Sequence, residues 1–375
     1  MIYFDSAATT LQKPDSVSKA MQSALRTMSS PGRGGHPAAM RAANVAFQCR
    51  SELAELFHVT DPERVVFTMN ATHALNLAIK TLVQPGGKVV ISGYEHNAVT
   101  RPLEALGAHV TVAEAPLFQA DAVAEAFRRC ISDDTCAVIC NHVSNVFGFV
   151  QPLEEIAAVC RERGVPLIVD ASQSAGILPL DMEKLDAAFI AMPGHKGLYG
   201  PQGTGVLLCG KEQEVHPLLE GGTGSLSAMQ QMPDFLPDRL EAGTHNMPGI
   251  AGLLAGVRYV RQRGVDRICR RECYLAHLMA EKLRGVPGVQ VFASENLRQQ
   301  AGVLSIVPEK ADVEALGEEL GRRGIAVRAG LHCAPLAHRS AGTLKTGTVR
   351  LSFSDFNTSE EVLRAAAEVR NCLRR

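Results

Sequence analysis

Between residues 64 and 209, short runs rich in β-branched residues alternate with stretches whose apolar residues recur at helical spacing. This alternation is typical of a sheet with many parallel strands that is covered by helices. The runs are apolar along their length, which predicts burial on both faces of the sheet. The expected strands are residues 65–69, 88–92, 109–113, 136–141, 166–170, 187–192 and 205–209, and a helix is expected at 153–163, before Gly164.

The pattern changes after a passage rich in glycine and proline at residues 220–248. Helices are expected at 250–263, 266–284, 312–323 and 359–373, and strands at 302–307, 325–328 and 348–353. A chain of 375 residues exceeds the size at which one hydrophobic core stops growing. We therefore expect an α/β protein with two domains: a large domain, residues 16–248, with a mixed and mostly parallel sheet, and a smaller α+β domain formed by residues 1–15 and 249–375.

Charge and composition exclude several classes of partner. The 38 Lys and Arg nearly balance the 39 Asp and Glu, and no long run of like charge occurs, so nucleic acid is not an expected partner. No apolar run approaches the roughly 20 residues of a membrane-spanning helix, and the first residues lack a secretory pattern. The ten cysteines form no C-x-x-C pair, so no metal site is expected. These features favour a cytoplasmic protein that does not bind membranes.

Two polar residues follow apolar strands where an open α/β sheet binds ligands. Asp170 ends the run at 166–170, and Lys196 lies in a glycine-rich bend, residues 193–203, after the run at 187–192. A carboxylate that keeps a pyridine nitrogen protonated and a lysine that binds a cofactor covalently are what a pyridoxal-phosphate enzyme needs. Taken singly, Asp170 is also explained as a helix cap, and Lys196 as a surface lysine.

The segments at 169–173 and 194–196 resemble those of the class V aminotransferase family, which are fold-type I pyridoxal-phosphate enzymes. The similarity extends from residues 3–9 to residues 357–361. It is greatest to the branch of cysteine desulfurases and selenocysteine lyases. The resemblance implies pyridoxal 5'-phosphate as the cofactor and a homodimer in which each subunit completes the other's site.

The resemblance also implies the cofactor-binding residues. Lys196 is expected to carry the cofactor, Asp170 to pair with its ring nitrogen, and His96 to stack on its ring and assist proton transfer. The other expected cofactor ligands are Ala71, Thr72, Asn145, Gln173, His195 and, from the neighbouring subunit, Thr244. Relatives commonly have a serine at the position of Pro193, so phosphate binding is expected to depend more on Thr72, His195 and Thr244.

Cys333 lies in the segment 328–336, which resembles the Arg-x-Gly-x-His-Cys pattern of desulfurases with a short catalytic loop. We expect Cys333 to be the nucleophile on a mobile loop that continues through residues 338–347, with His332 and Arg328 favouring the thiolate. The other nine cysteines are interpreted as buried structural residues.

Four residues are expected to bind the substrate. Arg350 is the one charged side chain on its face of the run at 348–353, and the family has an arginine here for the substrate carboxylate. Arg328, Asn145 and His36, which lies in a glycine-rich loop, are the other three.

The sequence thus predicts a cysteine desulfurase that converts L-cysteine to L-alanine and passes sulfur through a persulfide on Cys333 to an acceptor protein. A selenocysteine lyase acting on L-selenocysteine uses much the same residues and stays open. So does a thiol-independent aminotransferase, epimerase or β-lyase. A non-catalytic protein that kept only the fold is disfavoured because Asp170, Lys196 and Arg350 are all present.

Overall fold

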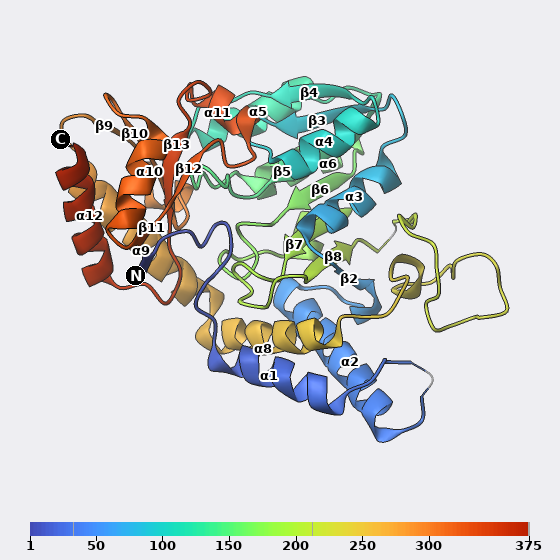
Figure 1. Ribbon diagram of the computed structural model, residues 1–375. Helices are drawn as coiled ribbons and strands as arrows, with labels where there is room; N and C mark the ends of the chain where they lie inside the picture. Colours follow the sequence, from blue (N-terminus) through green and yellow to red (C-terminus); the bar gives the residue numbers. More distant parts are fainter. Residues whose placement is uncertain (33, 212, 374–375) are drawn as a thin grey trace.

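A computed structural model describes residues 1–32, 34–211 and 213–373. Its centre is a seven-stranded sheet with the order β2-β8-β7-β6-β5-β3-β4 (Figure 1). Only β8 runs against its neighbours, so the sheet is mixed and mostly parallel, as expected. The strands are β2 Val65–Thr68, β3 Lys88–Ser92, β4 His109–Ala113, β5 Thr135–Asn141, β6 Leu167–Asp170, β7 Phe189–Pro193 and β8 Gly205–Cys209.

All seven predicted strands are present, with ends within two residues of the prediction. The expectation that each is buried on both faces is wrong for β4. Residues 109–111 of this strand are exposed, because β4 is at the edge of the sheet and pairs only with β3.

Helices cover both faces of the sheet, and successive side chains of a strand enter opposite layers. In β5, Val138 and Cys140 pack in the layer that contains α2, α5 and α6, whereas Ala137 and Ile139 pack in the layer with α3 and α4. Helix α8 packs against α1 and α2 (Figure 1). The helices of this part are α1 Asp15–Thr27, α2 Pro37–Phe57, α3 Ala71–Leu82, α4 Asn97–Ala105, α5 Ala120–Cys130, α6 Leu153–Arg163, α7 Met182–Leu185 and α8 Met247–Arg263.

The C-terminal part is built on a four-stranded antiparallel sheet with the order β12-β13-β10-β9. The N-terminal strand β1 pairs in parallel with β11, so the two ends of the chain share one lobe. The elements are β1 Ile2–Tyr3, α9 Val265–Leu283, β9 Val289–Phe292, β10 Val303–Pro308, α10 Val313–Arg322, β11 Ile325–Ala326, β12 Arg328–Gly330, α11 Pro335–Ser340, β13 Thr348–Ser352 and α12 Ser359–Leu373.

This lobe differs from the sequence prediction in several elements. Strands β1 and β9 and helix α11 lie outside the predicted elements, and the single strand expected at 325–328 is divided into β11 and β12, which belong to different sheets. The domain boundaries at 15/16 and 248/249 stay predictions.

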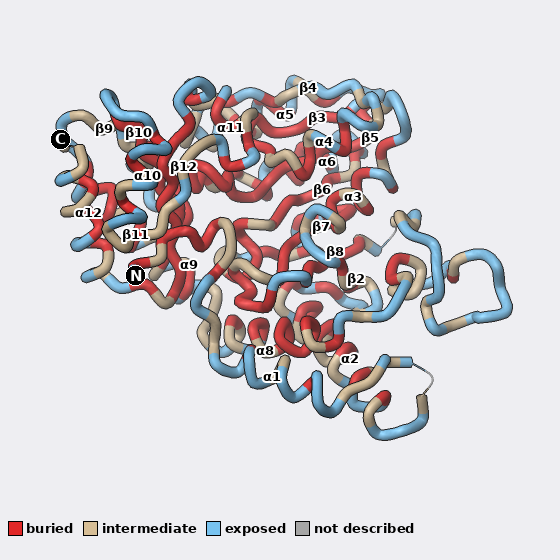
Figure 2. The backbone as a smooth tube through the Cα atoms, in the orientation of Figure 1, coloured by how far each residue is buried: buried red, intermediate tan, exposed pale blue. Residues whose placement is uncertain are grey.

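Burial follows the layers (Figure 2). The strands of the large sheet are largely buried, whereas much of the segment between β8 and α8 is exposed. In the described part of the chain, no helix combines the length and apolar character required to cross a membrane.

Candidate active site

A cavity of about 120 Å³ opens at the carboxyl ends of the parallel strands. It brings together eight of the residues predicted to bind the cofactor: Ala71, Thr72, His96, Asn145, Asp170, Gln173, His195 and Lys196. Six further residues line it that were not predicted as ligands: Asn70, Ala98, Asn141, Val143, Ser172 and Pro193. Asn141 ends β5 as Asp170 ends β6, so the same rule of strand ends would have found it.

Lys196 lies in a tight turn after β7 that glycines make possible. A Cβ atom on Gly194 would come within 2.2 Å of the Thr204 Oγ1 atom, and one on Gly197 within 2.4 Å of the Ala175 carbonyl oxygen. The Lys196 amine makes no hydrogen bond or ion pair with any described residue. Burial lowers its pKa to about 8, although nearby Asp170 opposes the shift. A neutral amine, able to act as a nucleophile or base, is therefore accessible near neutral pH.

Asp170 is buried at the end of β6, with 4% of its surface exposed. Its Oδ1 atom accepts a hydrogen bond of 2.9 Å from the Ser172 amide, so it does cap the following turn, as the simpler interpretation of this residue requires. Its charge also acts on the cavity, because it raises the pKa values of both Lys196 and His96 against the effect of burial. The two interpretations of Asp170 are compatible.

His96 caps helix α4 and lines the cavity. Its Nδ1 atom accepts a hydrogen bond of 3.0 Å from the Ala98 amide, which leaves the proton of the neutral ring on Nε2. Burial lowers the pKa of His96, with Asp170 opposing this effect. The ring is thus held as a neutral donor through Nε2.

The start of helix α3 offers a site for an anion. Asn70 caps the helix by accepting a hydrogen bond of 2.9 Å from the His73 amide. The amides of Ala71 and Thr72 have no acceptor among the described residues, and both residues line the cavity. Unpaired amides at the positive end of a helix dipole suit a phosphate group.

His195 borders the same cavity, and its Nδ1 atom lies 3.0 Å from the Thr9 hydroxyl. Burial lowers the pKa of His195 to about 4, and the charges of Lys196 and Lys13 add to the shift. At neutral pH this ring can donate a hydrogen bond to a phosphate but supplies no positive charge.

Asn145 and Gln173 are buried and line the same cavity. The Asn145 side chain donates from Nδ2 to the His332 carbonyl at 2.9 Å, whereas its buried Oδ1 atom has no partner. Gln173 donates from Nε2 to the Ala7 carbonyl at 3.0 Å. The unpaired Asn145 oxygen is therefore available to accept a hydrogen bond from a bound group.

Cys333 is exposed and lies in a turn where His332 and Cys333 both have left-handed backbone angles. Backbone hydrogen bonds attach this turn to two segments that line the cavity. The Cys333 carbonyl accepts a hydrogen bond of 2.8 Å from the Asn97 amide, next to His96, and the His332 carbonyl accepts one from Asn145. The turn that carries Cys333 thus lies beside the cavity, and Cys333 itself does not line it.

Two expectations about Cys333 require correction. The segment after it is not one long loop, because helix α11 begins at Pro335. His332 cannot favour a thiolate through its charge, since burial lowers its pKa to about 2 and leaves the ring neutral. The His332 Nε2 atom lies 3.1 Å from the Thr348 hydroxyl, so the ring packs against β13.

Arg350 is buried on β13 and does not line the cavity itself, yet its charge lowers the pKa of Lys196. Its Nη1 atom donates to the Asn145 carbonyl at 3.0 Å and its Nη2 atom to Asp5 Oδ1 at 2.9 Å. The buried Nε atom has no partner. Arg328, also predicted to bind substrate, pairs with the other oxygen of Asp5 at 3.1 Å.

His36 is exposed and caps helix α2, where its Nδ1 atom accepts a hydrogen bond of 3.4 Å from the Ala39 amide. It lies outside the cavity around Lys196. The structure thus gives His36 a local role at the start of a helix.

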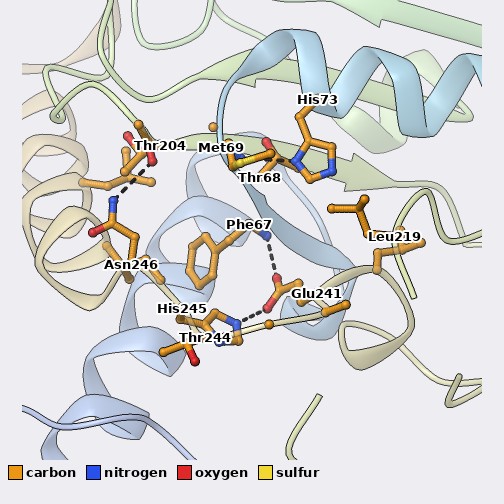
Figure 3. Close-up of a pocket in the computed structure, with 17 residues that line it drawn as sticks. Phe67, Thr68, Met69, His73, Thr204, Leu219, Glu241, Thr244, His245 and Asn246 are labelled. Carbon is orange, nitrogen blue, oxygen red and sulfur yellow. Dashed lines mark hydrogen bonds and ion pairs between the residues drawn. The ribbon is translucent and has the colours of Figure 1, made fainter. Parts of the chain in front are cut away.

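Thr244 does not join the other predicted ligands. It lines a second pocket of about 210 Å³, which Figure 3 shows beside His73 and Glu241. Glu241 is buried there and accepts hydrogen bonds from both terminal nitrogens of Arg50, at 2.8 and 2.6 Å. It also accepts hydrogen bonds from the Phe67 amide and the His245 ring (Figure 3). These contacts fix the segment that carries Thr244.

Comparison with known proteins identifies the family. Residues 2–364 match the model of the family described as aminotransferase class-V. The chain therefore belongs to the class V aminotransferase family.

Relatives within this family carry a more specific description. The chain is 34% identical to a probable cysteine desulfurase of Pyrococcus abyssi, over 96% of this chain and 92% of the relative. It is 33% identical to a probable cysteine desulfurase of Mycolicibacterium paratuberculosis, over 96% of this chain, and spans about half (54%) of that relative's length. The structure of a cysteine desulfurase from Thermococcus onnurineus superposes with a TM-score of 0.91 at 31% identity, covering 100% of this chain and 94% of that chain.

Membership of this family implies pyridoxal phosphate, and the cavity offers groups that fit it. The unpaired Lys196 amine suits covalent attachment, and the Asp170 carboxylate suits a ring nitrogen. The open amides of Ala71 and Thr72 suit the phosphate, and the unpaired Asn145 oxygen suits the ring hydroxyl.

Proposed function

We propose that the protein is a pyridoxal-phosphate-dependent cysteine desulfurase that converts L-cysteine to L-alanine. The observation that carries this proposal is the position of Cys333. Its exposed turn is hydrogen-bonded to Asn97 and Asn145, which flank and line the cavity around Lys196. A thiol in this place is what distinguishes sulfur transfer from the other reactions of the family.

The bound cofactor would supply an electron sink for the carbanion formed at the substrate's α-carbon. Lys196 accepts the α-proton, because burial leaves its amine partly neutral near neutral pH. Asp170 would keep the pyridine nitrogen of the bound cofactor protonated, and the Nε2–H group of His96 would donate a proton to the substrate. Arg350 binds the substrate carboxylate through its free Nε–H edge.

Cys333 then receives the sulfur. Its thiolate attacks the substrate sulfur atom, a sulfur–sulfur bond forms, and the carbon–sulfur bond breaks with its electron pair left on carbon. Protonation of that carbon and return of a proton from Lys196 to the α-carbon complete alanine, and Cys333 holds a persulfide. Because Cys333 is exposed, an acceptor protein can collect the sulfur from it.

Turnover of L-cysteine by the purified holoenzyme tests this proposal, with alanine and persulfide both measured. Cys333→Ser should still bind L-cysteine, as followed by the cofactor's absorption, but release no alanine, because a hydroxyl remains protonated where a thiol ionises. Cys130→Ser, at a partly buried cysteine on α5, is the matched control. Alanine release at the parental rate by Cys333→Ser would replace the desulfurase with a thiol-independent lyase.

A selenocysteine lyase remains the second candidate, since the same residues serve it. Parallel turnover of L-cysteine and L-selenocysteine separates the two. The Cys333→Ser variant should lose turnover of L-cysteine but retain some turnover of L-selenocysteine, because selenium leaves more readily than sulfur and depends less on a protein nucleophile.

We also propose that the protein works as a homodimer, in which Thr244 binds the cofactor phosphate of the neighbouring subunit. The location of Thr244 in a pocket separate from Lys196 supports this arrangement. Analytical ultracentrifugation of the holoprotein should give twice the mass of one chain. A monomer that binds the cofactor at full strength, or a Thr244→Ala variant that binds it as tightly as the parent, would contradict this proposal.

A further inference from the structure

The N-terminal segment brings a carboxylate between the two arginines predicted to bind substrate. Asp5 Oδ1 accepts a hydrogen bond of 2.9 Å from Arg350 Nη2, and Asp5 Oδ2 accepts from Arg328 Nε at 3.1 Å. The side chains of Asp5 and Arg350 are 12% and 3% exposed, whereas that of Arg328 is 53% exposed. Asp5 therefore joins a buried cation to a surface cation.

The backbone of Asp5 is fixed beside the strand that carries Arg350. Asp5 forms an isolated parallel bridge with Ser352 on β13, and the Ser352 amide donates to the Phe4 carbonyl at 2.8 Å. In Figure 1 the N-terminal segment runs beside this small sheet. The backbone of Asp5 is thus held beside β13, the strand that carries Arg350.

Arg350 is left with one edge free. Its Nη1 and Nη2 atoms are bound to the Asn145 carbonyl and to Asp5, but its buried Nε–H has no acceptor. A buried donor without a partner is costly unless a ligand satisfies it. The edge formed by Nε and the second hydrogen of Nη2 matches the two oxygens of a carboxylate. The two arginines and Asp5 together carry a net charge of +1, which one carboxylate neutralises.

We propose that Asp5 is a positioning residue that turns the free edge of Arg350 toward the carboxylate of an amino-acid substrate and compensates the charge of Arg328. This inference rests on the proposed function only in taking an amino acid as the substrate. Arg328 acts in it as a partner of Asp5.

The test is the binding of L-alanine and L-alaninamide to the holoenzyme, followed by the cofactor's absorption. The two ligands share amine and side chain and differ in the carboxylate. Asp5→Asn keeps the shape but removes the charge and one acceptor, so the dissociation constant for L-alanine should rise about 10-fold or more. The constant for L-alaninamide should change less than about twofold, and KM for the amino-acid substrate should rise more than kcat falls.

Asp355→Asn is the matched control. Asp355 is also buried, and it pairs with Arg263 at 2.6 and 2.9 Å rather than with Arg350. Its variant should leave the ratio of the two dissociation constants unchanged. Should Asp5→Asn fail to fold, Asp5→Glu keeps the charge and displaces the carboxylate, and the same rise for L-alanine alone is expected.

An unchanged ratio in a folded Asp5 variant would overturn the proposal. This outcome is distinct from failure of the desulfurase assignment, because neither ligand contains sulfur. A protein that acted on another amino acid would still show a changed ratio of the two dissociation constants in the Asp5 variant. A desulfurase in which Asp5 lacks this role would show an unchanged ratio and would still release alanine from cysteine.

Discussion

The two sides of the candidate site differ in how their polar groups are held. On the side of the large sheet, the Lys196 amine is unpaired, and Lys196, His96 and His195 all have pKa values lowered by burial. On the side of the small sheet, Arg350 is fully charged and fixed by Asp5. The groups proposed to react are thus easily neutralised, whereas the group proposed to anchor the substrate is charged and hydrogen-bonded to Asp5.

The largest effect is expected where an unpaired group is removed. Lys196→Ala should lower turnover to background and prevent covalent attachment of the cofactor, since no other amine lines the cavity among the described residues. Borohydride reduction followed by mass spectrometry measures the attachment. Lys184→Ala, at an exposed lysine on α7, is the control and should behave as the parent. Retained attachment in Lys196→Ala would remove this residue from the site.

The next largest effect is expected for Asp170→Asn. The amide keeps the size of the side chain but cannot hold a proton on the pyridine nitrogen, so kcat should fall roughly 10²- to 10³-fold. Circular dichroism should show an unchanged fold, because the amide oxygen can still accept from Ser172. A parental rate would show that Asp170 only caps its turn.

On the side of the small sheet, a positive charge without the planar guanidinium group of arginine should not be enough to bind the substrate carboxylate. Arg350→Lys preserves the positive charge but cannot bind Asp5, Asn145 and a carboxylate together, so KM should rise roughly 10- to 100-fold. Steady-state kinetics separate KM from kcat. Arg263→Lys, in the ion pair with Asp355, is the control. A parental KM for Arg350→Lys would mean that charge alone binds the substrate.

The smallest effect concerns stability. Glu95 is fully buried behind the cavity, and burial raises its pKa to about 8, although hydrogen bonds from Ser92 and the Asn141 amide oppose the shift. Between its usual pKa of 4.5 and about 8, the folded state binds a proton that the unfolded state has released, so stability falls as pH rises.

Glu95→Gln removes that dependence. Relative to the parent, the free energy of unfolding of the variant should therefore increase with pH across this window, by at most about 1.4 kcal/mol per pH unit. Denaturant unfolding of the cofactor-free protein at several pH values measures it, with the exposed Glu104→Gln as control. Parallel pH profiles for the parent and Glu95→Gln would show that Glu95 is already ionised.

The sequence predicted the large sheet well because each of its strands can be recognised from residues that are adjacent in the sequence. Each strand is a short apolar run, and Asp170 and Lys196 follow such runs directly, so the rule that ligands bind at strand ends was enough to bring them together. The resemblance to the family supplied the cofactor, and with it the roles assigned to Thr72 and His96.

The anchoring side was harder to predict because its contacts are remote in sequence. Asp5 and Arg350 are separated by 345 positions, and nothing in the segment around Asp5 indicates a partner. The neutrality of His332 depends on burial against β13, which sequence spacing does not reveal. Ion pairs and burial of this kind arise from packing between segments that are distant in the sequence, so they appear only in the structure.

The nitrogen and the oxygen of the Asn145 side-chain amide have different roles. Its nitrogen holds the turn of Cys333 through the His332 carbonyl, and its free oxygen is available to a group bound in the cavity. Because one rigid plane carries both atoms, a ligand that favours the present orientation of the amide also stabilises the turn. By reciprocity, ordering the turn raises the affinity for that ligand by the same factor. Under the proposed function, a cofactor bound through the Asn145 oxygen would therefore also order the turn that carries Cys333, which would couple sulfur transfer to occupancy of the site.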